Sequence, residues 1–223
     1  MKRCLLVALL TALAIGAAQA TPLTFSFSGT VDNDPFGVFG SATFGGVYTF
    51  ESSIPEVLST PNSRGFADTG SAVSMTVSFT GTLDPSMAGP YIADKLNITV
   101  NNDFPGPLDQ YLVTGTSSSD NLLAIELTLD DFTGTAFSTL ALPLTPPSLG
   151  AFTSVRFALF DGTLDNPIEA EGALQKLECV AGCGVVLLPE PSTLLVLVAA
   201  LGALGLSRKM RRATSARSAL GHR

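Results

Sequence analysis

Apolar and hydroxyl side chains alternate along much of the chain between residues 21 and 180. In VSMTVSF (73–79) every second residue is apolar and the others are Ser or Thr. A period of two places apolar side chains on one face of a β-strand and polar ones on the other, as in antiparallel sheets with one solvated face. The same alternation occurs in LTFSF (23–27), LNITV (96–100), LAIELTL (123–129) and SVRFALF (154–160).

Turn-forming residues separate these runs, as in DNDP (32–35), DP (84–85), NND (101–103) and DG (161–162). No segment outside the two termini has the pattern of an amphipathic helix. Many short strands with turn signals predict an all-β fold, an antiparallel β-sandwich of jelly-roll type, with a barrel as the alternative.

A Gly-Thr pair follows an apolar strand and precedes an Asp in FSFSGTVDN (25–33), VSFTGTLDP (77–85) and FALFDGTLDN (157–166). We interpret this as one strand-to-turn device used several times. The Gly permits a bulge or bend and the Asp starts the turn.

The first twenty residues have the pattern of a secretory signal peptide. MKR is a short basic region, LLVALLTALAI is an apolar stretch, and Ala18-Gln19-Ala20 is a cleavage site with small residues at both ends. We expect cleavage after Ala20, so that residues 1–20 are removed and Thr21 begins the mature protein.

The charges are segregated along the chain. The segment from 21 to 190 holds nineteen acidic and four basic residues, a net charge of −15, and the other basic residues lie at the two termini. Such a field disfavours nucleic acid and anionic membrane surfaces as partners. The sequence therefore predicts an exported acidic domain over 21–184.

Few residues in this chain could carry catalysis. The only histidine is His222, which excludes Ser-His-Asp, Cys-His and histidine-based metal sites within the domain, and a phosphate-binding Gly-rich loop is missing. We therefore predict no catalytic, cofactor or metal residue. Two alternatives stay open: a glycosidase that uses two carboxylates, and calcium bound at the oxygen-rich turns 32–34 and 161–166.

Two cysteines remain in the mature chain, Cys179 and Cys183, with Gly182 between them to ease a bend. In an oxidising exterior we expect this pair to form a small-loop disulfide.

An apolar run, Leu194–Leu206, lies near the end of the chain and is followed by Arg208, Lys209, Arg211 and Arg212. With Ser192 and Thr193 it makes about 22 Å of helix at ~1.5 Å per residue, and the basic side chains can extend its reach across a bilayer. Pro191 suits the first turn of this helix. The four cations act as a membrane stop and predict a cytoplasmic tail, 213–223, with the acidic domain outside.

Pro189-Glu190-Pro191, the apolar helix and the basic cluster together resemble the PEP-CTERM sorting signal, here over 185–212. The resemblance implies export by a Gram-negative bacterium that makes extracellular polysaccharide, and processing by an exosortase, a membrane-embedded cysteine transpeptidase-like enzyme. By position, Pro189, Glu190 and Pro191 are the residues that it would recognise.

The expected function is that of a non-enzymatic surface or extracellular-matrix protein, anchored in the inner membrane until an exosortase processes it. Extracellular polysaccharide is a candidate partner. The alternatives are a displayed carbohydrate- or calcium-dependent binding module and a carboxylate-based glycoside hydrolase.

Overall fold

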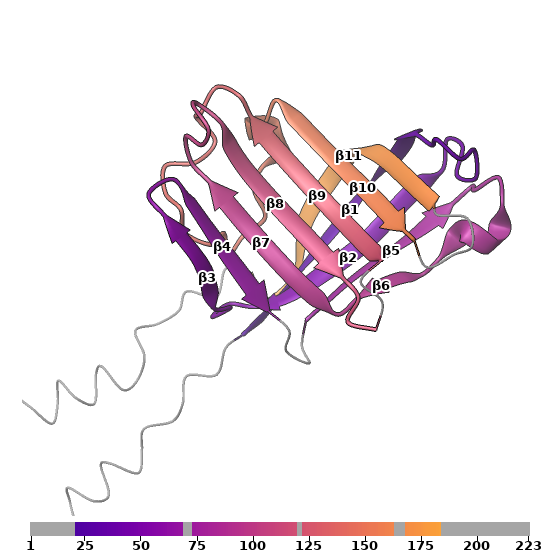
Figure 1. Ribbon diagram of the computed structural model, residues 1–223, viewed down its shortest axis with the longest axis horizontal. Helices are drawn as coiled ribbons and strands as arrows, with labels where there is room; N and C mark the ends of the chain where they lie inside the picture. The colour runs from indigo at the N-terminus through magenta and orange to yellow at the C-terminus, as the bar shows by residue number, and fades with distance from the viewer. Residues whose placement is uncertain (1–20, 69–72, 120–121, 163–167, 184–223) are drawn as a thin grey trace, which may run out of the picture. The chain divides into compact units, whose positions relative to one another are not determined.

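The described part of the chain forms one antiparallel sheet of eleven strands (Figure 1). The computed structural model describes residues 21–68, 73–119, 122–162 and 168–183, all within one compact unit, Ala20–Gly184. The strands are β1 (Pro22–Asn33), β2 (Thr43–Glu51), β3 (Glu56–Thr60), β4 (Ser63–Asp68), β5 (Ser74–Thr80), β6 (Tyr91–Ala93), β7 (Lys95–Asn101), β8 (Asp109–Thr116), β9 (Leu123–Asp131), β10 (Ser154–Asp161) and β11 (Ile168–Ala181). Two single 3₁₀ turns, η1 (Pro85–Ala88) and η2 (Leu149–Ala151), lie in the loops.

The sheet folds over on itself in the order β3-β4-β7-β8-β9-β10-β11-β1-β2-β5-β6, and β7–β10 lie in front of β1, β2 and β5 (Figure 1). Strand β11 joins the two layers, because its residues 168–173 pair with β10 and its residues 171–181 pair with β1. Three register shifts interrupt the β1–β11 pairing, and such irregularities bend a strand and increase its twist. The result is a sandwich-like, all-β domain.

Side chains from the two layers meet in a buried aromatic core. The rings of Phe44 (β2) and Phe157 (β10) stack with centroids 4.1 Å apart. The hydroxyl groups of Tyr48 (β2) and Tyr111 (β8) share a buried hydrogen bond of 3.2 Å, and both side chains are fully buried. Burying aromatic side chains from both layers supplies much of the hydrophobic stabilisation of the domain.

The alternating runs form strands as predicted. They lie in β1, β5, β7, β9 and β10, and in β9 every odd-numbered residue from Leu123 to Asp131 is buried while the even-numbered residues are half-buried. The run 154–160 ends with Phe160, whose side chain is 44% exposed on the outer face. The period of two thus identifies the inward faces correctly.

Two glycines make room for the Phe44 ring. A Cβ on Gly29 (β1) would lie 2.5 Å from Phe44 Cζ, and a Cβ on Gly172 (β11) would lie 2.7 Å from Phe44 Cε1. Each would also collide with a carbonyl oxygen of the neighbouring strand, at 2.0 Å and 2.4 Å. These positions therefore require glycine for close approach between a backbone and a ring.

The glycines of the first two copies behave as interpreted, but Asp32 of the first copy lies within β1 and does not start a turn. Gly29 lies at a register shift between β1 and β11, and Gly81 ends β5 with a φ of +82°. Asp84 then caps η1 by accepting the backbone N–H of Ser86 at 2.9 Å. The third copy ends in residues 163–166, which lie outside the described residues.

The strand order differs from the expected jelly-roll connectivity. A jelly roll has two four-stranded sheets built from two Greek keys, whereas here β7 to β11 follow one another as a meander within one sheet. The reason lies in β11, which is long enough to pair with both layers. The expected signal helix and transmembrane helix lie outside the described residues.

Candidate functional site

Among the sequence-predicted site residues, the structure describes the cysteine pair. The others lie outside the described residues: Ala18, Ala20, Pro189, Glu190, Pro191, Arg208, Lys209, Arg211 and Arg212. Within the described ranges no helix has the length and apolar character needed to cross a membrane.

Cys179 and Cys183 form the predicted disulfide, with Cα atoms 6.1 Å apart. It closes a loop at the end of β11, beside the start of β1, since Phe25 is the register partner of Cys179. Gly182 turns the chain there with a φ of +79°, against the carbonyl oxygen of Pro22. The first and last described segments of the domain are therefore direct neighbours.

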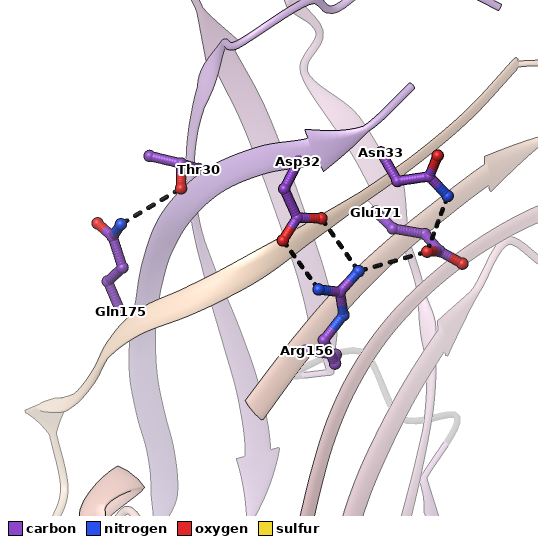
Figure 2. Close-up of polar contacts among 6 residues, drawn as sticks. All are labelled: Thr30, Asp32, Asn33, Arg156, Glu171 and Gln175. Atoms are coloured by element: carbon purple, nitrogen blue, oxygen red, sulfur yellow. Dashed lines mark hydrogen bonds and ion pairs between the residues drawn. The ribbon is translucent and has the colours of Figure 1, made fainter. Parts of the chain in front are cut away.

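The first candidate calcium turn is held by protein contacts. Both carboxylate oxygens of Asp32 accept hydrogen bonds from the Arg156 guanidinium, at 2.8 and 3.0 Å (Figure 2). The same guanidinium forms an ion pair with Glu171 at 3.4 Å. Asn33 also donates to Glu171, at 3.0 Å. These contacts join the ends of β1, β10 and β11, and a cation would have to displace Arg156 to reach Asp32.

Asp34, in the same turn, accepts the backbone N–H groups of Phe39 and Gly40 through one oxygen, both at 2.7 Å. Burial opposes ionisation of this carboxyl, but the surrounding backbone N–H groups outweigh it and lower the pKa of Asp34. These N–H donors occupy one oxygen of the carboxylate, and the other oxygen, Oδ1, is buried and accepts no hydrogen bond from the described residues. The other candidate turn begins at the buried Asp161 and continues into residues 163–167, outside the described ranges.

A buried pair of carboxylates that the sequence does not reveal lies where β8 begins and β9 ends. Asp109 and Asp131 are register partners with exposed fractions of 0% and 1%. Asp109 accepts the N–H groups of Asp103 and Phe137. Asp131 accepts hydrogen bonds from the hydroxyl and N–H groups of Thr133 and from the Thr135 N–H, and these lower its pKa.

This pair anchors loops and does not line a cleft that a polysaccharide chain could enter. Glycosidases need two carboxyls that flank a bound glycosidic bond. Asp109 and Asp131 are enclosed, and their oxygens are occupied by donors from the loops 102–108 and 132–137. Their geometry fits a structural role.

One outer face of the domain carries mainly hydroxyl groups. It comprises twelve outward positions of three adjacent strands, β1, β2 and β5, between Asp32 at one end and Glu51 at the other, and we name it the hydroxyl face. Ten of its twelve residues are Ser or Thr: Thr24, Ser26, Ser28, Thr30, Thr43, Gly45, Val47, Thr49, Ser74, Thr76, Ser78 and Thr80.

The strand registers place these residues in four rows of three. Thr24 pairs with Thr49 and Thr49 with Ser74 at one end, and Thr30 pairs with Thr43 and Thr43 with Thr80 at the other. The hydroxyl groups of Thr24 and Thr49 lie 3.0 Å apart. Side chains in such rows are neighbours across the sheet, so the hydroxyl groups form a continuous array.

A shallow depression lies within the hydroxyl face. Its volume is about 240 Å³ and its lining residues are Gly45, Gly46, Val47, Thr76, Val77 and Ser78. A Cβ on Gly45 would have only one neighbouring atom, 4.0 Å away. The outer side of β2 is therefore open at this position. The depression therefore lies over the backbone of β2, beside the Thr76 and Ser78 side chains.

The outer face of β8, β9 and β10 differs in charge. Its outward residues include Glu126, Asp130 and Arg156. The twelve positions of the hydroxyl face are uncharged, so a neutral polar ligand that binds there displaces water from hydroxyl groups and not from ions.

Comparison of the chain with protein-family models, with curated proteins and with solved structures finds no match.

Proposed function

We propose that this protein is an exported, non-enzymatic surface or extracellular-matrix protein that an exosortase processes through its C-terminal signal. The observation that carries the proposal is the three-part tail: Pro189-Glu190-Pro191, the apolar run Leu194–Leu206 and the basic cluster that begins at Arg208. During export the helix holds the chain in the inner membrane, with the acidic domain outside.

Two features of the domain support export. A disulfide joins Cys179 to Cys183, and disulfides persist in oxidising compartments. The ends of the domain are neighbours, because β1 and the end of β11 pair from Thr24 and Ala181 onward. An N-terminal signal and a C-terminal anchor therefore leave the domain at the same end of the β1–β11 pair.

Replacement of Pro189 and Pro191 by Ala tests the sorting proposal in the native organism. We expect the unprocessed chain to accumulate in the membrane fraction, measured as intact mass after fractionation. The matched control replaces Pro146 and Pro147, a pair in the loop between β9 and β10, and should be processed normally. Normal processing of the Pro189/Pro191 variant would refute exosortase recognition at this motif.

The hydroxyl face favours a second function, binding of a neutral polysaccharide. Ser and Thr hydroxyls can donate to and accept from sugar hydroxyls, and the uncharged face avoids the cost of desolvating ions. The acidic remainder of the domain would repel an anionic polymer.

Affinity electrophoresis in gels containing dextran or alginate, each with and without Ca²⁺, separates the binding alternatives. The proposal expects retardation by dextran without Ca²⁺, and loss of retardation when Ser78 is replaced by Glu. Thr114→Glu, on the opposite outer face, is the control. Retardation by alginate with Ca²⁺ alone would instead favour the calcium-dependent module, and no retardation by either polymer would leave the hydroxyl face without this function.

A further inference from the structure

The first residue after the expected cleavage site is already fixed to the sheet. The backbone N–H of Thr21 donates to Ser52 Oγ at 3.2 Å, and the backbone N–H of Ser52 donates to the Thr21 carbonyl at 3.0 Å. Pro22, the next residue, is the register partner of Glu51. The backbone nitrogen of Thr21 therefore lies one residue from the position that faces Glu51.

Glu51 carries a carboxylate oxygen whose hydrogen-bonding capacity is unused. Its Oε2 atom is buried and accepts no hydrogen bond from any residue in the described ranges. A buried acceptor without a donor costs free energy, and a buried carboxylate oxygen costs more than a neutral one. Such an atom indicates a site that a donor, preferably a cation, would complete.

Side-chain cations are paired elsewhere in the described part of the chain. The salt bridges are those of Arg64 with Glu56, of Arg156 with Asp32 and Glu171, and of Lys176 with Glu178. Hydrogen bonds from Ser118 chiefly lower the pKa of Asp94, and the fourth basic residue, Lys95, lowers it further.

We infer that Glu51 and Ser52 form a binding site for the α-ammonium group that cleavage after Ala20 creates on Thr21. Before cleavage the Thr21 nitrogen is an amide with one hydrogen, which it donates to Ser52 Oγ. Hydrolysis of the Ala20–Thr21 peptide bond consumes one water and leaves a carboxylate on Ala20 and an amine on Thr21. Once protonated, this amine has three hydrogens and a positive charge, so it can keep the Ser52 contact and also donate to Glu51.

This inference rests on the export step of the proposed function and goes beyond it. Cleavage does more than release the chain, because it also supplies a cation beside Glu51, at the end of the β1–β2 pair. The mature domain is then more stable than its precursor, since only the mature form contains the ammonium–carboxylate pair.

A two-by-two comparison tests the pairing. Chains 21–223 and 19–223, each with wild-type Glu51 or with Glu51→Gln, are purified in the same detergent and their Tm values compared at pH 6. With the wild-type acid, the chain that begins at Thr21 should have a Tm roughly 2–4 °C higher than the longer chain. In the Glu51→Gln pair of chains this difference should vanish. Glu169→Gln, an outward residue of β11, is the control and should keep it.

The pH dependence gives a second readout. The pair raises the pKa of the α-amino group above its ordinary value of about 8, so its stabilising effect is present below that pH and is lost as the pH rises through the raised pKa. Equal Tm values for the two wild-type chains, or an undiminished difference with Glu51→Gln, would overturn the inference.

The inference and the proposed function can fail separately. Both N-termini are fixed in the purified chains, so the Tm comparison tests the Glu51 site whatever the cell does. Intact mass of the exported protein tests cleavage after Ala20 on its own, and the Pro189/Pro191 variant tests the tail.

Discussion

At the scale of single residues, two buried tyrosine hydroxyl groups are hydrogen-bonded to each other within the apolar core. Tyr48 and Tyr111 come from different layers, and each hydroxyl is the other's hydrogen-bond partner at 3.2 Å. Burial raises the pKa of both phenols, and for Tyr48 the neighbouring Tyr111 raises it further. Both hydroxyl groups therefore stay protonated, and removing one leaves the other buried without its hydrogen-bond partner.

The Tyr pair should show strong non-additivity. Tyr48→Phe leaves the Tyr111 hydroxyl buried without its partner and should reduce the free energy of unfolding by about 1–3 kcal/mol, as should Tyr111→Phe. The double variant removes both hydroxyls and should be close to wild type. Urea denaturation of the four proteins measures the coupling. A double variant that loses the sum of the two single effects would show that the hydroxyls act independently.

At the scale of one strand, β2 carries two adjacent glycines with opposite requirements. Gly46 faces inward, where a Cβ would lie 2.4 Å from Phe27 Cζ and 2.2 Å from the Thr76 carbonyl oxygen. Gly45 faces outward into the depression of the hydroxyl face, where a Cβ meets open space. Gly46 therefore allows close packing in the core, and Gly45 leaves the depression on the outer surface open.

Alanine at these two positions separates the roles. Gly46→Ala should lower the free energy of unfolding by about 1–3 kcal/mol, because the added methyl group overpacks the core and displaces a neighbouring strand. Gly45→Ala should be neutral or slightly stabilising, because it restricts the unfolded chain. Thermal unfolding monitored by circular dichroism provides the comparison. Equal effects of the two variants would contradict the assignment of inward and outward faces in β2.

The same strand shows what the sequence could and could not predict. Five strands follow from alternation, which is unbroken in β5 and is interrupted by the outward Phe160 in β10. The sequence analysis does not predict the other six strands, and in β2 and β11 the reason is that glycines occupy inward positions such as Gly46 and Gly172, where the apolar pattern needs a large residue. The space at those glycines is filled by rings from neighbouring strands, which is information that the local sequence does not contain.

The hydroxyl face could not be predicted from the sequence either. Alternation predicts that Ser74, Thr76 and Ser78 share one side of a strand. That β5 lies beside β2 depends on the sheet folding over, since β3 and β4 pair in the other layer. The disulfide needed only a short spacing and an oxidising compartment, so the sequence was sufficient for it.

At the scale of the whole molecule, the disulfide secures the last strand where the chain leaves the domain. The Cys179–Cys183 loop contains five residues, for which the loop-entropy relation gives about 2 kcal/mol of stabilisation. Replacing both cysteines by Ser should lower the midpoint of urea denaturation accordingly, without changing the slope.

Wild type in a reducing agent provides the internal control for this prediction. It should match the double Ser variant, and adding the reducing agent to the variant should have no further effect. A variant as stable as the oxidised wild type would show that β11 holds its end without the covalent link.

The position of β11 in the middle of the sheet has a mechanical consequence. A pull on the tail enters the domain at the end of a strand that is hydrogen-bonded to β10 along one part and to β1 along another. Traction along that strand loads the backbone hydrogen bonds to both neighbouring strands in shear, whereas an edge strand has hydrogen bonds to one neighbour. A domain pulled through this end therefore distributes the load over two sets of backbone hydrogen bonds.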